Sequence, residues 1–414
     1  MNRKRRQNRT DPVRILLLTY NKTLRGYVSN LAQQQFAQTE EIELEVSTFS
    51  KWAWTALDKP RMLERADGEE WISGFAKNVD LPDEFVIEEV NYLLGKFLPE
   101  NLTDYMNVRR DGRGGSPKME KPTREALLNE VVFPYLAAKA ANGLSDWNDV
   151  AVGMARAKYF SYDIVIADET QDFSANQIRG IMNQLMNPSS TTFILDTAQR
   201  IYASGFIWQE VGIVVRPENS FRLSSNYRNT KEIALFAASF LKGLSNDDDG
   251  TSPNFDGTMR TGSKPRVVVG LYRNQLADAI KFIKDNVDLE NESVAILQPR
   301  NSFSFARTRL VEAGLPYVAI SRESEWPTGP ENIALSTLHS AKGLEFDHVF
   351  ILGLNAEMMP HGPGEDDDRL VTLRRLVAMG IGRAKISVTL GYKGSDVSEV
   401  MKFADKKTFD EVAV

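Results

Sequence analysis

Short apolar runs alternate with helix-type patterns along both halves of this sequence. Runs typical of buried strands lie at 14–19, 43–48, 163–167 and 191–195 in the first half, and at 266–271, 293–297, 333–336, 348–352 and 386–390 in the second. Apolar residues spaced three and four apart predict intervening helices at 23–38, 178–185, 230–244, 275–287 and 369–379. This alternation predicts an α/β fold with two parallel-sheet layers flanked by helices.

Residues 55–125 interrupt this alternation. They are rich in Trp, Glu and Lys, and they include the glycine- and arginine-rich stretch 109–115. We expect an inserted, partly helical subdomain with a mobile basic loop. The length of 414 residues predicts two domains, since a typical domain has about 100–200 residues.

The composition excludes several classes of protein. The chain has 50 Lys and Arg, 56 Asp and Glu, a formal net charge of −6, three histidines and no cysteine. A disulfide scaffold, a cysteine nucleophile and a thiolate metal site are therefore excluded. No apolar run reaches the roughly 18 residues that a membrane span needs, and the basic stretch 3–9 lacks the apolar core of a signal peptide. We expect a cytoplasmic protein with no membrane partner.

An acidic pair follows one of the predicted strands. The run at 163–167 delivers Asp168 and Glu169 to its carboxyl end, where ligands bind in open α/β sheets. Adjacent carboxylates at such a place suit a Mg²⁺ ion on a nucleotide phosphate and a base that orients water. Solvated acids in a strand-to-helix turn are the alternative interpretation.

The acidic pair opens the sequence Asp-Glu-Thr-Gln-Asp, and further segments follow in a fixed order. Downstream of the pair are Leu-Asp-Thr-Ala-Gln-Arg-Ile-Tyr at 195–202, Asn-Tyr-Arg at 226–228, Thr-Leu-His-Ser-Ala-Lys-Gly-Leu-Glu-Phe at 337–346, and the segments 374–376 and 380–384. Upstream of it are Leu-Leu-Thr-Tyr-Asn-Lys at 17–22 and Ser-Thr-Phe at 47–49. The ordered set, spanning 15–390, resembles the motifs of the UvrD/Rep/PcrA-like superfamily 1 helicases.

This resemblance implies a fold and an activity. The fold is two RecA-like parallel-sheet lobes, at 1–216 with a small, partly helical insertion at about 55–125, and at 217–414. The activity is ATP-dependent helicase or translocase action on single-stranded DNA, with ATP hydrolysed in the cleft between the lobes. The implied cofactors are ATP and Mg²⁺.

The resemblance also assigns roles at the nucleotide. Asp168 would hold Mg²⁺, Glu169 would activate the attacking water and Gln199 would sense the γ-phosphate. Arg228 and Arg383 would stabilise charge on the transferring phosphoryl group, which suits the planar, permanently charged guanidinium. The remaining implied nucleotide contacts are Gln171, Gly343 and Glu345, the last at the ribose. Without the motifs, each arginine would be interpreted as a surface salt bridge and Gly343 as a turn glycine.

The implied contacts to nucleic-acid phosphate or sugar are Thr19, Asn21, Thr48, Thr337 and His339. Tyr202, with Phe206 and Trp208 nearby, offers rings on which bases stack, and core packing is the alternative for this trio. His339 taken alone would be interpreted as a structural histidine. The sequence leaves the choice between DNA and RNA open, and a protein partner such as a nuclease is a further expectation.

The sequence departs from the family pattern at several positions. Leu195 replaces a glycine, Ser50 a histidine, Gly382 a threonine, and Asn229 a serine. The large departure is the phosphate-binding loop, which the family places about thirty residues before position 15, where this sequence has no room for it. The segment 257–265 has similar glycine spacing, but its lysine comes one place late, and we interpret it as coincidence.

Missing this loop, the chain would bind ATP weakly, since the loop amides and lysine cradle the phosphates. We expect either that the natural chain begins upstream or that the protein is ATPase-impaired. The alternative function is a non-catalytic nucleic-acid-binding or assembly subunit of a DNA repair or phage-defence complex. The sequence therefore predicts a helicase-family protein and leaves its catalysis open.

Overall fold

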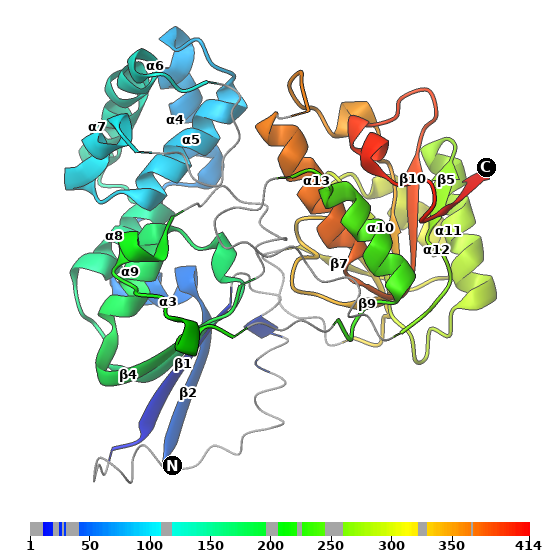
Figure 1. The fold of residues 1–414 in the computed structure, drawn as a ribbon, viewed down its shortest axis with the longest axis horizontal. Helices are drawn as coiled ribbons and strands as arrows, with labels where there is room; N and C mark the ends of the chain where they lie inside the picture. Colours follow the sequence, from blue (N-terminus) through cyan, green and yellow to red (C-terminus); the bar gives the residue numbers. More distant parts are fainter. Residues whose placement is uncertain are drawn as a thin grey trace. The chain divides into compact units, whose positions relative to one another are not determined.

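The computed structural model describes ten segments of the chain in two compact units. They are residues 11–19, 25–26, 29, 41–108, 118–195, 206–221, 226–244, 260–321, 329–365 and 367–414. The first unit holds the described residues up to 221 and the second those from 226 onward. Figure 1 shows the chain as a ribbon. Among the described residues, no helix combines the length and apolar character needed to cross a bilayer.

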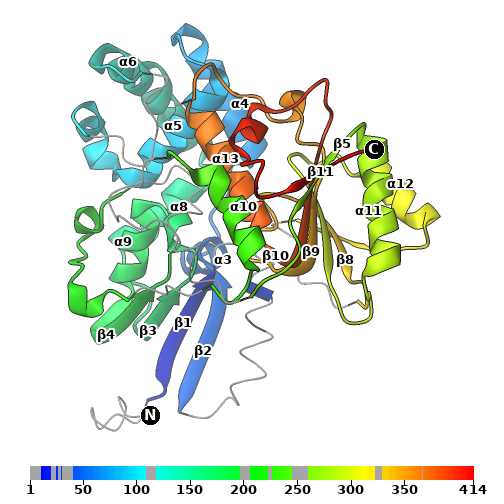
Figure 2. The same ribbon diagram turned by 45° about the vertical axis from the view of Figure 1, so that its right-hand side comes forward.

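The first unit is built on a four-stranded sheet with the order β2-β1-β3-β4, in which every pair is parallel. The strands are β1 (Val13–Thr19), β2 (Ile42–Thr48), β3 (Tyr162–Ala167) and β4 (Leu185–Phe193). Figure 2 shows them side by side. The predicted strands at 14–19, 43–48 and 163–167 are confirmed within one residue at each end.

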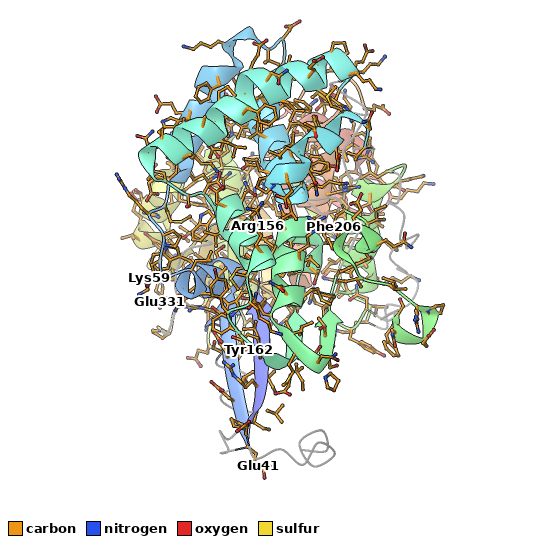
Figure 3. All side chains as sticks on the ribbon, turned by 90° about the vertical axis from the view of Figure 1, so that its left-hand side faces the viewer. Glu41, Lys59, Arg156, Tyr162, Phe206 and Glu331 are labelled. Carbon is orange, nitrogen blue, oxygen red and sulfur yellow. The ribbon has the colours of Figure 1, made fainter. Side chains whose placement is uncertain are left out.

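Three helices pack on this sheet: α3 (Phe49–Ala56), α8 (Trp147–Arg156) and α9 (Ala175–Asn183). Their apolar faces meet the strands in one core that includes Leu16, Trp52 and Ile178. The indole nitrogen of Trp52 donates at 3.1 Å to the hydroxyl of Tyr162, the first residue of β3, which is labelled in Figure 3. All three helices begin with a side-chain cap that satisfies exposed amides of the first turn: Thr48 for α3, Asp146 for α8 and Ser174 for α9.

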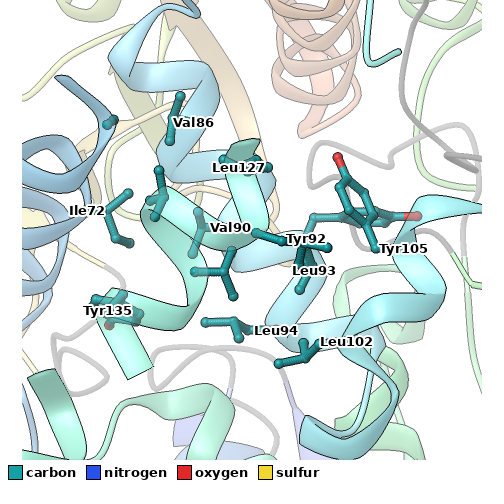
Figure 4. Close-up of a cluster of buried hydrophobic side chains, with 14 of the residues drawn as sticks. Ile72, Val86, Val90, Tyr92, Leu93, Leu94, Leu102, Tyr105, Leu127 and Tyr135 are labelled. Carbon is teal, nitrogen blue, oxygen red and sulfur yellow. The ribbon is translucent and has the colours of Figure 1, made fainter. Parts of the chain in front are cut away.

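The segment between β2 and β3 contains a helical cluster with its own core. Its helices are α4 (Arg65–Phe75), η1 (Ala76–Asn78), α5 (Asp83–Lys96), η2 (Pro99–Met106), α6 (Lys121–Ala126), η3 (Leu127–Val132) and α7 (Phe133–Asn142). Figure 4 shows the buried side chains that these helices share, among them Val90, Leu93 and Leu127. The hydroxyl of Tyr105 donates to the buried carboxylate of Glu89 at 2.5 Å, so this charged group has a partner inside the core. The bounds 55–125 for an insertion stay a prediction, and the basic loop at 109–115 lies outside the described residues.

The second unit contains a seven-stranded parallel sheet with the order β11-β5-β10-β9-β6-β8-β7. Its strands are β5 (Arg266–Val269), β6 (Val294–Gln298), β7 (Val318–Ile320), β8 (Ile333–Thr337), β9 (Phe346–Ile351), β10 (Ala384–Tyr392) and β11 (Asp410–Ala413). The principal helices are α10 (Lys231–Leu241), α11 (Tyr272–Asn286), α12 (Ser304–Glu312) and α13 (Asp368–Ile381). Single turns occur in the first unit at η4 (Thr170–Asp172), η6 (Trp208–Val211) and η7 (Pro217–Asn219), and in the second at η9 (Ala356–Met358) and η10 (Glu399–Phe403).

The two sheets together confirm the predicted α/β class with two parallel sheets, consistent with two RecA-like lobes. Every residue of β6 is buried, as expected for a central strand covered on both faces. The short strands β7 and β11 were not predicted, since three or four residues give too little pattern to separate a strand from a loop.

Candidate nucleotide and nucleic-acid site

The acidic pair lies in a turn at the carboxyl edge of the first sheet. The amide of Asp168 donates to the carbonyl of Leu18 at the end of β1, at 2.9 Å. The amide of Thr170 donates to the carbonyl of Ile194, just beyond β4, at 2.8 Å. Backbone hydrogen bonds therefore connect the turn to β1 and to the residue after β4. Together with β3, which precedes the turn, these strand ends position its carboxylates.

Glu169 has a left-handed backbone, with φ 54° and ψ 40°. For a residue with a Cβ this conformation costs about 1–2 kcal/mol. The carboxylate of Asp168 accepts a hydrogen bond from the amide of Glu169 at 2.9 Å, and the side-chain amide of Gln171 donates to the carboxylate of Glu169. The buried Gln171 thus contacts the predicted base, and its predicted contact with nucleotide stays a prediction.

The acidic turn offers oxygen ligands of the kind that Mg²⁺ prefers. Within the described residues, no group of three or more His, Asp or Glu side chains could hold a metal by itself. Mg²⁺ commonly keeps several waters and is bound by one or two carboxylates together with substrate phosphates. The Asp168 carboxylate is of the type that binds a Mg²⁺ arriving with a nucleotide, and its role as the Mg²⁺ ligand stays a prediction.

Two predicted nucleic-acid contacts lie at the same edge of this sheet. Thr19 and Thr48 are register partners at the ends of β1 and β2, and both are buried. The Thr48 hydroxyl accepts from the amide of Lys51 at 3.3 Å and so caps α3. The structure therefore gives Thr48 a capping role, which the resemblance did not include.

In the second unit, Arg228 and Glu345 form an ion pair. The Arg228 Nη2 and the Glu345 Oε1 are 2.5 Å apart, and the Lys385 Nζ lies 3.6 Å from the other carboxylate oxygen. The side chain of Asn226 folds the backbone before Arg228, because its Oδ1 accepts from the amides of Arg228 and Asn229 at 3.1 and 3.2 Å. Two predicted nucleotide contacts from distant motifs therefore lie together.

Arg383 lies next to this pair in the same unit, at the amino end of β10. Its side chain is 2% exposed, and its guanidinium donates to the carbonyls of Met379 and Leu344 at 3.3 and 3.4 Å. The carbonyl of Arg383 accepts from the amide of Phe346 at 2.9 Å. The residues on both sides of Glu345 thus bond to Arg383, so the motifs at 226–229, 343–346 and 380–384 form one cluster.

The stretch 337–346 connects opposite edges of the second sheet. Thr337 ends β8 at the carboxyl edge, while Phe346 begins β9 at the amino edge, paired with Ala384. The Thr337 hydroxyl donates to the Ser340 hydroxyl at 2.9 Å. Gly343 has φ 82°, which favours glycine, so a turn explains its presence as well as a phosphate contact does. His339 is half-buried in the turn after β8.

The aromatic residues divide into packed and exposed ones. Phe206 and Trp208 pack at the edge of the first core, with ring centroids 5.4 Å apart, which favours core packing over base stacking; Phe206 is labelled in Figure 3. Tyr227, beside Arg228, was not predicted as a contact, although its side chain is 69% exposed. The predicted residues Asn21, Gln199 and Tyr202 lie outside the described residues.

Comparison with known proteins places part of the chain in a family. Residues 315–394 match the UvrD-like helicase C-terminal domain. DNA helicase II of Escherichia coli (strain K12) is 40% identical over 84 residues, which are 20% of this chain and 12% of that protein. The ATP-dependent DNA helicase Rep of the same organism is 39% identical over 59 residues, 14% of this chain and 9% of that protein.

Two further proteins are similar to this chain. The ATP-dependent DNA helicase srs2 of Schizosaccharomyces pombe is 28% identical over 123 residues, 30% of this chain and 13% of that protein. A crystal structure of the C-terminal domain of a possible DNA helicase from Lactobacillus plantarum is 22% identical with a TM-score of 0.33, covering 45% of this chain and 99% of that one. At that TM-score the likeness adds nothing to the assignment.

The matched regions cover between 9% and 13% of the length of these three curated relatives. The second unit carries the UvrD-like helicase C-terminal domain, which includes Thr337, Gly343, Glu345 and Arg383. The predicted resemblance to the UvrD-like superfamily 1 helicases is confirmed.

Proposed function

Because its second unit carries a UvrD-like helicase C-terminal domain, we propose that this protein is a UvrD-like, ATP-dependent DNA helicase or translocase acting on single-stranded DNA. The observation that carries the proposal is the cluster of Arg228, Glu345 and Arg383, which three separate motifs supply. Two arginines and a carboxylate from distant parts of a chain suit a phosphate ligand with a ribose.

The proposed catalytic roles fall on residues of both units. In the first unit, Asp168 holds the Mg²⁺ that accompanies the phosphates, and Glu169 accepts a proton from the attacking water. A bound Mg²⁺ neutralises the charge that develops on the phosphate oxygens. In the second unit, Arg228 and Arg383 stabilise that charge through the guanidinium fork. Gln199 completes the proposed catalytic set, and Gln171 and Gly343 the nucleotide contacts.

The buried state of Arg383 has a consequence for this mechanism. Its guanidinium donates to two backbone carbonyls, at 3.3 and 3.4 Å. Both are long hydrogen bonds to neutral acceptors, and a phosphate would offer the guanidinium a charged acceptor. We expect the Arg383 side chain to change its partners when nucleotide binds.

For single-stranded DNA, the proposed contacts are Thr19, Asn21, Thr48, Tyr202, Thr337 and His339. Their hydroxyl, amide and imidazole groups bond phosphate or sugar, and the Tyr202 ring stacks on a base. Affinity is expected to fall as salt rises, because phosphate binding releases counterions. RNA is the alternative ligand, and a nuclease is a proposed protein partner.

The test is nucleotide binding and single-strand-stimulated ATP hydrolysis by the full chain. We expect salt-sensitive binding of single-stranded DNA and weak binding of ATP, with marginal hydrolysis, since residues 1–414 contain no Gly-x-x-x-x-Gly-Lys-Thr/Ser sequence. Strong DNA-stimulated ATP hydrolysis that Glu169→Gln abolishes would contradict the expected marginal hydrolysis. It would support an active ATP-dependent helicase. Absence of both nucleotide and DNA binding at low salt would contradict the proposal itself.

A second candidate function is a non-catalytic nucleic-acid-binding or assembly subunit of a DNA repair or phage-defence complex. The observation that favours it is Arg383, which at 2% exposure is placed more like a structural residue than a catalytic one. In that case single-strand binding persists and ATP leaves it unchanged. Loss of binding on addition of ATP and Mg²⁺ would favour the motor.

A further inference from the structure

The side chain of Asn229 joins the two segments that carry the proposed catalytic arginines. Asn229 directly follows Arg228 and is 7% exposed. Its Nδ2 donates to the carbonyl of Gly382 at 3.0 Å and to the carbonyl of Ala384 at 2.6 Å. These two carbonyls flank Arg383, so one amide group bonds the backbone on both sides of that arginine.

Both ends of this link are held in place. The Oδ1 of Asn229 accepts from the Nδ2 of Asn226 at 3.0 Å, and the amide of Asn229 donates to the Oδ1 of Asn226 at 3.2 Å. At the other end, the amide of Arg383 donates to the carbonyl of Gly380 at 3.2 Å, and its carbonyl accepts from Phe346 at 2.9 Å. The side chain of Asn229 therefore has little freedom, and a shift of one segment is transmitted to the other.

We propose that Asn229 is a positioning residue that fixes the backbones of Arg228 and Arg383 relative to each other. Both guanidinium groups then meet one anionic ligand in a set geometry. The inference rests on the proposed function, from which it takes a nucleoside triphosphate as that ligand. Asn229 touches neither reacting atoms nor ligand and acts only through the two arginines.

The identity of the side chain supports this role. A serine, common at this position in the family that the motifs resemble, has one hydroxyl hydrogen and can bond one carbonyl. The asparagine amide has two hydrogens and bonds both. Small displacements matter here, because an ångström of misplacement at a phosphoryl-transfer site removes much of the benefit of orientation.

The experiment measures binding of a fluorescent ATP analogue with Mg²⁺ to the full chain and its variants. Asn229→Ala removes both hydrogen bonds, and we expect binding about tenfold weaker, as two lost bonds of modest strength imply. In an Arg383→Ala background the same substitution should cause no further loss. Asn332→Ala is the matched control, because Asn332 donates its amide to a loop carbonyl of the same unit, Leu289, at 2.7 Å.

A second readout is independent of nucleotide. Amide hydrogen exchange at Phe346, whose acceptor is the carbonyl of Arg383, should accelerate in Asn229→Ala and stay unchanged in Asn332→Ala. If Asn229→Ala folds poorly, Asn229→Ser retains one donor and should give an intermediate loss of affinity.

The outcomes separate this inference from the proposed function. Unchanged affinity in a folded Asn229→Ala chain would overturn the positioning role, and so would an equal loss in the Arg383→Ala background. Failure of the unsubstituted chain to bind the nucleotide would instead count against the ATP-dependent motor and favour the non-catalytic second candidate. In that case amide hydrogen exchange still tests whether Asn229 fixes the backbone at Arg383. Unaltered exchange at Phe346 in Asn229→Ala would overturn that role.

Discussion

The Arg228 guanidinium and the Glu345 carboxylate pair at 2.5 Å, although the two residues belong to different motifs. The side chains are 38% and 36% exposed, so solvent screens the pair, and its contribution to stability is small. For the proposed function the pair matters through orientation, because it fixes the direction of a partly exposed guanidinium.

Glu345→Gln tests this orientation. We expect the free energy of unfolding to change by less than about 1 kcal/mol, since the pair is half-exposed, while nucleotide affinity falls several-fold. Chemical denaturation and nucleotide titration measure the two effects. Glu312→Gln is the matched control, because Glu312 pairs with Arg309 at 2.6 Å at a similar exposure of 55% and 50%. Equal effects of both substitutions on nucleotide binding would argue against a role for Glu345.

Because Glu169 has a left-handed backbone, we expect its substitution by glycine to raise the stability of the fold. Glu169→Gly removes the left-handed penalty of about 1–2 kcal/mol, and the extra flexibility of glycine offsets part of this gain. Glu169→Ala also lacks the carboxylate but keeps the penalty, so the difference between the two variants isolates the backbone effect. Denaturant unfolding should find the glycine variant more stable by up to about 1 kcal/mol. Equal stability of the two would show that the turn holds no such strain.

Gly380 in α13 gives a test of packing between two motifs. A Cβ at this position would lie 2.4 Å from the Cδ2 of Leu338 and 3.0 Å from the Cδ1 of Ile351, and both of these side chains are fully buried. We expect Gly380→Ala to destabilise the second unit by about 1–3 kcal/mol, because a filled core resists an added methyl group.

Gly74 provides the control for this prediction. It lies in helix α4, and an added Cβ would meet no atom within 4 Å. Gly74→Ala should therefore stabilise the chain by about 0.5–1 kcal/mol through helix propensity. Thermal unfolding of both variants checks the pair of predictions. A stabilising Gly380→Ala would mean that α13 can move away from Leu338 at little cost.

Asp347 predicts a pH dependence of stability in the second unit. Burial opposes ionisation, but hydrogen bonds from the amide and hydroxyl of Ser293, at 2.9 and 2.7 Å, outweigh it and hold the pKa of Asp347 below its ordinary value of 3.8. A lowered folded-state pKa stabilises the fold above the unfolded-state pKa, and the contribution is lost as pH falls through the folded value. Asp347→Asn should therefore flatten the acid limb of the stability curve.

Unfolding measured between neutral pH and about pH 3 tests the effect of Asp347, since that range spans the ordinary carboxyl pKa. Asp285→Asn is the control, because Asp285 is an exposed residue of α11 in the same unit. An acid limb that is as steep in Asp347→Asn as in the unsubstituted chain would contradict the prediction.

Much of the fold could be predicted from the sequence, for reasons that particular strands make clear. The runs at β1 and β3 are continuous and apolar, which a buried parallel strand requires, and the turn after β3 had to place its acids at the sheet edge. The strand β4, by contrast, begins at Leu185, earlier than predicted, because its polar residues at 187–192 carry no apolar pattern. The ordered motifs predicted the family, and the match at 315–394 confirms it.

The sequence by itself determined which residue types occur in which order: the strands, the acidic turn and the motifs. Tertiary structure decided their partners. Glu345 pairs with Arg228, and Asn229 bonds the carbonyls on both sides of Arg383. Apolar periodicity is a local property that any short window of sequence carries. A hydrogen bond between residues over a hundred positions apart exists only after the sheet has brought its strand ends together, so no local pattern can encode it.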